Sequence, residues 1–167
     1  MIEQVRAIIG QFLDGAGLEW EPGARDGEYI VTLPGEQKLK TGVSLLVGAK
    51  ALTTRAFVIR HPDENAEGFY TFLLRRNLRM GPIAYSIDGT GDVYVGGRVP
   101  LAAVTADYLD DVLGAVLEAA DAPFNELLVL GFLTSMKREW AWRIKRGEST
   151  YNLEAFRHLL QGEDDPS

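Results

Sequence analysis

Apolar and polar residues recur along this chain with two different periods, and the changes of period divide it into segments. From Ile2 to Leu13 the apolar residues return every three or four positions, which predicts an amphipathic helix that ends near Gly15. Three β-rich runs follow, EYIVTLP, LKTGVSLLV and ALTTRAFVIR, separated by GEQK and by the short loop GAK. In the middle run apolar residues and Thr41 occupy one face, and Lys40, Gly42 and Ser44 the other. One face of the sheet is therefore expected to be solvated, which favours antiparallel strands.

A helical pattern returns in GFYTFLLRRNLRM, which is followed by the breaker Gly81-Pro82. The apolar residues of this segment spread around most of the helix, so it is predicted to contact two surfaces. Two further strands, AYSI and DVYVGGRV, are joined by the turn-forming sequence DGTG. Thr105 is then expected to cap a third helix, which ends or bends at Pro123.

The last part of the chain contains a buried segment over 125–133 and the basic run KREWAWRIKRG. A short helix around Asn152 to Gln161 is expected before the acidic tail GEDDPS, which we expect to fray. The order α-β-β-β-α-β-β-α plus a C-terminal helical extension predicts an α+β fold with a five-stranded antiparallel sheet. We expect a domain over residues 1–142 and an extension over 143–167.

Composition limits the classes of partner. The 167 residues carry 24 acidic and 17 basic side chains, a formal net charge of −7. Long-range attraction to DNA or to an anionic membrane is therefore disfavoured, and a basic partner protein is favoured. The chain has no cysteine, and its first residues lack the uninterrupted apolar core of a signal peptide. We therefore expect a cytoplasmic protein that does not span a membrane.

The stretch GDVYVGGRVP resembles, at first sight, a loop that holds a phosphate. It lacks the GxxxxGK[ST] spacing of a P-loop, and no GxGxxG here follows a strand and opens a helix. Gly96 and Gly97 are better explained as a bulge or as room for a neighbouring backbone. The DGTGD turn also resembles the start of a calcium loop, but valines stand where the glycine and the glutamate of that loop belong.

Catalytic residues are not evident. Asp107, Asp110 and Asp111 lie in the first turns of the third helix, where carboxylates favour the helix dipole, and His61 is typical of a turn residue. None of the serines lies in a G-x-S-x-G sequence. We assign no catalytic residue, cofactor or metal and predict a protein that is not an enzyme. A hydrolase built on two distant carboxylates stays open, because distances in space are invisible in a sequence.

The basic run interleaves aromatic and cationic residues in a way that could stack bases and hold phosphates. The residues concerned are Trp140, Trp142, Arg143, Lys145 and Arg146. The same pattern also fits tryptophans that pack while the charges stay in water, and the acidity of the whole chain favours this interpretation. Direct binding of single-stranded nucleic acid is therefore kept as the alternative function.

Residues 28–142 resemble the YbjN-like bacterial family, whose fold is similar to that of type III secretion chaperones. The most specific matches are Asn77, Gly91-Asp92, Gly97-Arg98, Pro100-Leu101 and Phe124-Asn125. The resemblance implies a homodimeric, non-enzymatic protein-binding module with roles in regulation and stress response, and it supplies no catalytic residues.

We therefore expect a chaperone-like or regulatory homodimer that binds a partner protein. The dimer would form through a sheet edge or through the helix from Phe69 to Met80. A basic nucleic-acid-binding protein or a stress-response protein would be a physically sensible partner. The candidate interaction residues are Phe69, Tyr70, Leu74, Leu78, Arg98, Trp140 and Trp142.

Overall fold

A six-stranded antiparallel sheet runs through the molecule in the order β1-β2-β3-β4-β6-β5. The structure, a computed structural model, describes residues 1–161, so the acidic tail for which fraying was expected lies outside the described residues. The strands are β1 Glu19–Pro22, β2 Glu28–Pro34, β3 Lys40–Val47, β4 Ala51–Ile59, β5 Ala84–Ile87 and β6 Val93–Pro100.

The prediction of five strands was wrong by one, because β1 is a sixth strand at the edge of the sheet. Its four residues include two glutamates and a proline, so the sequence shows no apolar alternation there. The strand forms because it pairs with β2 and because Trp20 packs on Tyr29, with ring centroids 5.4 Å apart. The strand conformation of β1 therefore depends on its pairing with β2, because its own sequence pattern does not specify a strand.

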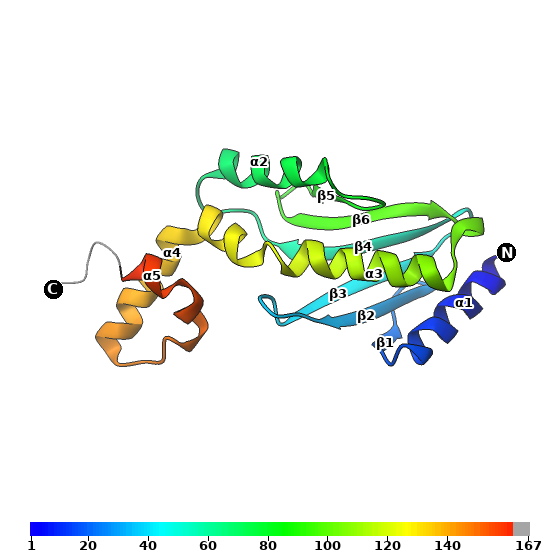
Figure 1. Cartoon of the computed structure of the whole chain (residues 1–167), viewed down its shortest axis with the longest axis horizontal. Coiled ribbons are helices and arrows are strands. Elements are labelled where there is room, and N and C mark those ends of the chain that lie inside the picture. The colour runs from blue at the N-terminus through cyan, green and yellow to red at the C-terminus, as the bar shows by residue number, and fades with distance from the viewer. Residues whose placement is uncertain (162–167) are drawn as a thin grey trace.

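The first three helices and the short last one lie in the order that the sequence predicted, and the third lies across one face of the sheet (Figure 1). Residues 124–146, which were predicted only as a buried segment and a basic run, form one long helix. The bounds of the helices are α1 Ile2–Gly15, α2 Ala66–Asn77, α3 Ala106–Asp121, α4 Phe124–Arg146 and α5 Arg157–Leu160, with short 3₁₀ turns η1 Leu101–Ala103 and η2 Tyr151–Phe156. The Thr105 side chain accepts a hydrogen bond from the backbone N–H of Tyr108 at 3.0 Å, which confirms the predicted cap of α3.

The main core lies between the sheet and the helices. Alternate residues of the central strands point into it, among them Val43 and Leu45 of β3 and Leu52 of β4, all fully buried. On the opposite face of β4 the side chains of Arg55 and Phe57 are exposed. One face of the sheet is thus wet, as the alternation in the middle β-rich run predicted.

The loop between β2 and β3 fixes the junction of α3 and α4. Asp121, at the end of α3, accepts hydrogen bonds from the backbone N–H groups of Gln37 (2.9 Å) and Lys38 (2.7 Å). The Gln37 side chain in turn accepts one from the N–H of Asn125, at the start of α4 (3.1 Å). Polar groups at the end of α3 and the start of α4 are thereby satisfied by one loop.

Helix α4 belongs to two cores. Its first half packs into the main core through Leu127 and Phe132, and its second half carries a separate apolar cluster with η2 and α5. The buried members of that cluster are Met136, Trp140, Phe156 and Leu160. The domain boundary expected at residue 142 therefore falls inside a continuous helix, and the second core begins before it. Figure 1 shows α4 leading away from the sheet to this extension.

Candidate protein-interaction surface

Helix α2 is anchored by its inward side chains. Phe69 is fully buried and its ring meets the edge of the Phe132 ring of α4, with centroids 6.2 Å apart. Leu73, one turn later, is also buried. Of the residues predicted for partner contact, Phe69 is thus part of the core and cannot reach a partner in this conformation. Tyr70 is half-buried and donates a hydrogen bond to the Gly91 carbonyl at 2.7 Å.

The outward side of α2 carries exposed apolar side chains. Leu74 is 68% exposed and Leu78, at the end of the helix, is 89% exposed. Residues four apart lie on the same side of a helix, so these two leucines form one apolar surface. On strand β5, Ile87 is also exposed, at 55%. We call the pair Leu74 and Leu78 the α2 surface.

A side chain from α2 closes part of the free edge of β5. Asn77 accepts a hydrogen bond from the Tyr85 N–H at 2.7 Å, and its amide donates one to the Tyr85 carbonyl at 3.2 Å. Both backbone groups of Tyr85 are therefore occupied by a side chain rather than left for another strand. Open strand edges promote pairing with other chains, and this arrangement blocks that pairing at the middle of β5.

The hairpin before β6 uses its polar groups internally. Asp88 accepts hydrogen bonds from the N–H groups of Thr90 and Asp92, each at 3.0 Å, and Gly91 adopts a positive φ of 86° in the turn. Asp92 accepts from the His61 backbone N–H at 2.9 Å and lies 2.9 Å from the His61 Nδ1 atom. These contacts, led by the His61 backbone, hold the pKa of Asp92 below its usual range. The turn is thus a structural one, consistent with the rejection of a phosphate loop.

The two glycines of β6 make room for neighbouring backbone, which was one of the two explanations that the sequence offered. A Cβ at Gly96 would overlap the Thr54 carbonyl, and a Cβ at Gly97 would overlap the Pro82 carbonyl. The irregularity in the pairing of β4 with β6 lies between Phe57 and Ile59 of β4 instead. Arg98, next in β6, is exposed and forms no ion pair with any residue of the described range.

The structure separates the two tryptophans of the basic run. Trp140 is 6% exposed and belongs to the second core, whereas Trp142 is 45% exposed and lies under the Arg146 guanidinium at 4.7 Å. Arg143 pairs with Glu139 and also donates to the Ser149 carbonyl. With one ring buried and one guanidinium already paired, the two tryptophans do not form a stacking platform for successive bases.

The environment of Lys38 was not indicated by the sequence. The Lys38 ammonium donates hydrogen bonds to the carbonyls of Phe57 (2.9 Å) and Val58 (2.7 Å) and lies over the Phe57 and Phe124 rings. Burial lowers its pKa. It borders a cavity of about 550 Å³ between β4 and α4. The backbone carbonyls and rings that hold this lysine come from segments distant in sequence, so its position in GEQK gave no indication of the role.

Within residues 1–161, no group of three or more His, Asp or Glu side chains could hold a metal ion. Over the same span, no helix is both long and apolar enough to cross a bilayer. The arrangement offers an apolar surface, a strand edge closed at Tyr85 and the cavity beside Lys38.

Comparison with known proteins gives a family and a fold. Residues 6–128 match the sequence model of the YbjN family, described as "putative bacterial sensory transduction regulator". The uncharacterized protein Rv0487 of Mycobacterium tuberculosis is 49% identical over 159 residues, which cover 93% of this chain and 87% of the relative.

Among solved structures, a chain of the ExsC-ExsE complex aligns with a TM-score of 0.54 and 21% identity, covering 76% of this chain and 96% of that one. The Yersinia pestis type III secretion chaperone SycH, in complex with a fragment of YscM2, aligns with a TM-score of 0.49 and 17% identity over 70% of this chain and 96% of that one. The match to the ExsC-ExsE chain is a likeness of fold.

Proposed function

Because the chain belongs to the YbjN family, we propose that it is a non-enzymatic protein-binding module of chaperone-like or regulatory type. The observation that carries this proposal is the α2 surface, where Leu74 and Leu78 expose two large apolar side chains on a helix whose other side is firmly anchored. Contiguous apolar surface on a soluble protein commonly marks a place of interaction. The fold supports the proposal, since one solved chain of similar fold is found in a two-protein complex.

The α2 surface is also the better place for self-association. We propose a homodimer through the helix face rather than through a sheet edge. At one edge of the sheet Asn77 occupies the backbone of Tyr85, and at the other β1 is short and carries Glu19, Glu21 and Pro22. Charge, proline and blocked backbone groups all disfavour strand addition. Light scattering at micromolar concentration tests the dimer, and a strict monomer would refute it.

The charge of the chain bears on the class of partner. A net charge of −7 attracts basic proteins over long range, so we propose a basic partner, of which a nucleic-acid-binding or stress-response protein is an example. Steering of this kind weakens as ionic strength rises. The rate of association with the partner should therefore fall with added salt, while the apolar contact at the α2 surface remains.

Capture from an extract of the source organism tests the function and the surface together. The bait proteins are the wild type, the double variant Leu74→Ser with Leu78→Ser, and the control Leu39→Ser. Leu39 is 82% exposed in the loop before β3, so its replacement removes a similar leucine from another surface. We expect one specifically enriched protein with the wild type and the control, and its loss with the double variant. Enrichment of no protein would refute the function, and retention by the double variant would refute the surface.

A further inference from the structure

A cavity of about 640 Å³ lies between the end of α2, the loop that follows it and α3. Part of its wall is apolar and comes from Phe72, Met80, Ile83, Ala115 and Ala119. Cavities of roughly 300–1000 Å³ with a mainly apolar lining and a few polar groups are typical of small-molecule sites. The cavity adjoins the α2 surface, because Leu78 also lines it, whereas Leu74 does not.

The charged part of the wall is strongly one-sided. Three arginines, Arg75, Arg76 and Arg79, line the cavity against one carboxylate, that of Glu118. None of the three lies within ion-pair distance of a carboxylate anywhere in the described part of the chain. On a chain with a net charge of −7, a cluster of unpaired guanidinium groups is a local reversal of sign. Their position near the end of α2 favours the helix dipole, but Arg79 lies beyond the helix and gains little from it.

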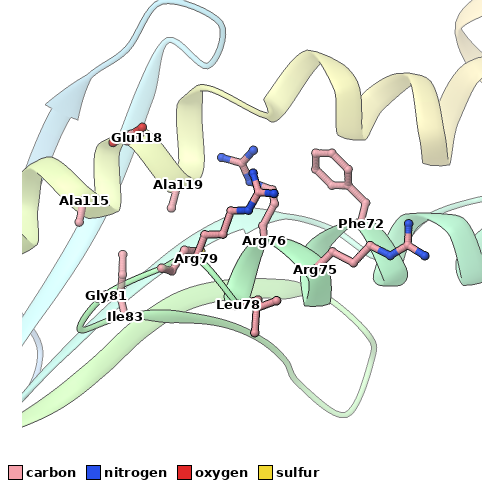
Figure 2. A pocket seen from close by; sticks show the side chains of 11 residues that line it. Phe72, Arg75, Arg76, Leu78, Arg79, Gly81, Ile83, Ala115, Glu118 and Ala119 are labelled. Carbon is pink, nitrogen blue, oxygen red and sulfur yellow. The ribbon is translucent and has the colours of Figure 1, made fainter.

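The Arg76 side chain packs on an aromatic ring, but one of its N–H donors has no hydrogen-bond partner. Its guanidinium lies over the Phe72 ring, 5.6 Å from the centroid, and its Nε atom is buried with no hydrogen-bond partner. A buried N–H donor without an acceptor is unfavourable. This atom is closed off from the cavity, so a ligand there would meet other atoms of the half-buried Arg76 side chain. Figure 2 shows the Arg76 and Arg79 side chains extending toward α3, while Arg75 points away from them.

We propose that this cavity binds a small organic anion. Its carboxylate or phosphate group lies between Arg76 and Arg79, and its apolar part packs against Phe72, Ile83 and Ala119. Planar guanidinium groups match both anions through paired charge-assisted hydrogen bonds. The volume lies within the range of small-molecule sites. The proposal goes beyond the binding of a partner protein and does not depend on it.

Four matched probes separate the contributions of charge and apolar body. Octanoate and octyl phosphate carry both, octan-1-ol has the tail without the charge, and inorganic phosphate has the charge without the tail. Each is titrated into the full chain while the methyl signals of Ile83 and Met80, which line the cavity, are followed by NMR. We expect saturable shifts with the two amphipathic anions only, and their ratio of affinities distinguishes a carboxylate from a phosphate site.

Two variants and one control test the arginines. Arg79→Gln and Arg76→Gln should each weaken binding of the better anion at least about tenfold, the factor expected for loss of one charge-assisted hydrogen bond. Arg98→Gln removes an exposed, unpaired arginine from β6 and should leave the affinity unchanged. Because Arg79 is exposed, its variant should fold normally even if the half-buried Arg76 cannot be replaced.

The proposal is overturned by any of three results. These are an equal response to octan-1-ol, an equal response to inorganic phosphate, or binding that Arg79→Gln leaves intact. No saturable shift with any probe also overturns it and points to a partner protein or a second copy as the occupant. Capture of a partner is a separate readout and would survive each of these results, since Leu74 lies outside the cavity although Leu78 lines it.

Discussion

Replacing Asn77 by alanine removes both hydrogen bonds that hold the edge of β5, to the N–H and to the carbonyl of Tyr85 (2.7 and 3.2 Å). A hydrogen bond of this kind contributes about 1 kcal/mol net, and the cost is higher where a buried group is left without a partner. We therefore expect the free energy of unfolding to fall by about 2 kcal/mol. With a urea dependence of about 2 kcal/mol/M, the midpoint of unfolding should drop by about 1 M.

Urea denaturation followed by circular dichroism gives this midpoint. The control is Asn152→Ala, because Asn152 is exposed and no side-chain hydrogen bond is found for it in the described residues, so its midpoint should not move. Light scattering over rising protein concentration adds a second readout. Asn77→Ala leaves an open strand edge and should associate more strongly than the wild type.

Asn77→Asp keeps the acceptor for the Tyr85 N–H but places a carboxylate oxygen against the Tyr85 carbonyl. At neutral pH it should be at least as unstable as the alanine variant, and it should recover on acidification because the protonated acid can donate again. A midpoint for Asn77→Ala within about 0.3 M of the wild type, with unchanged association, would refute this account of the edge.

Three further predictions concern other parts of the fold. Arginine and serine neighbours lower the pKa of Glu28 from 4.5 to about 2. Its contribution is thus complete above pH 4.5 and is lost toward pH 2, so thermal unfolding of Glu28→Gln should depend less on pH in that window. Gly97→Ala should destabilise by about 1–3 kcal/mol through overlap with Pro82, whereas Gly114→Ala, in open space on α3, should stabilise slightly in the same urea assay. Trp140→Ala should abolish hydrogen-exchange protection in the extension and leave the main core protected.

Much of the fold was predictable because its elements have strong periods. The stripe of α3 and the cap at Thr105 are both local signals, and the structure bears out both. The missing element, β1, has no such signal, since Trp20 stands among charged residues and pairing alone makes it a strand. The continuity of α4 was hidden for another reason. Its buried residues serve the main core first and a second core afterwards, so no single stripe runs along the helix.

The interaction surface was predictable only in part. The wide apolar distribution on α2 predicted contact with two surfaces, and the structure shows one of them, the core. The pattern could not tell the buried Phe69 from the exposed Leu74. Asn77 was noticed as a matching residue, while its role depends on the backbone of a strand eight residues away. The arginines of LLRRNLR were equally visible, yet the apolar wall of their cavity includes Ala115 of α3, which only folding brings near.

The two cores share α4, so the direction of the extension depends on the number of residues that separate them. Each residue of an α-helix turns the chain by about 100° and advances it by about 1.5 Å. One residue inserted in α4 between Phe132 and Met136 would swing the extension by more than a quarter turn, whereas seven would return it almost to its original bearing. The length of this helix therefore sets the rotation of the extension relative to the sheet.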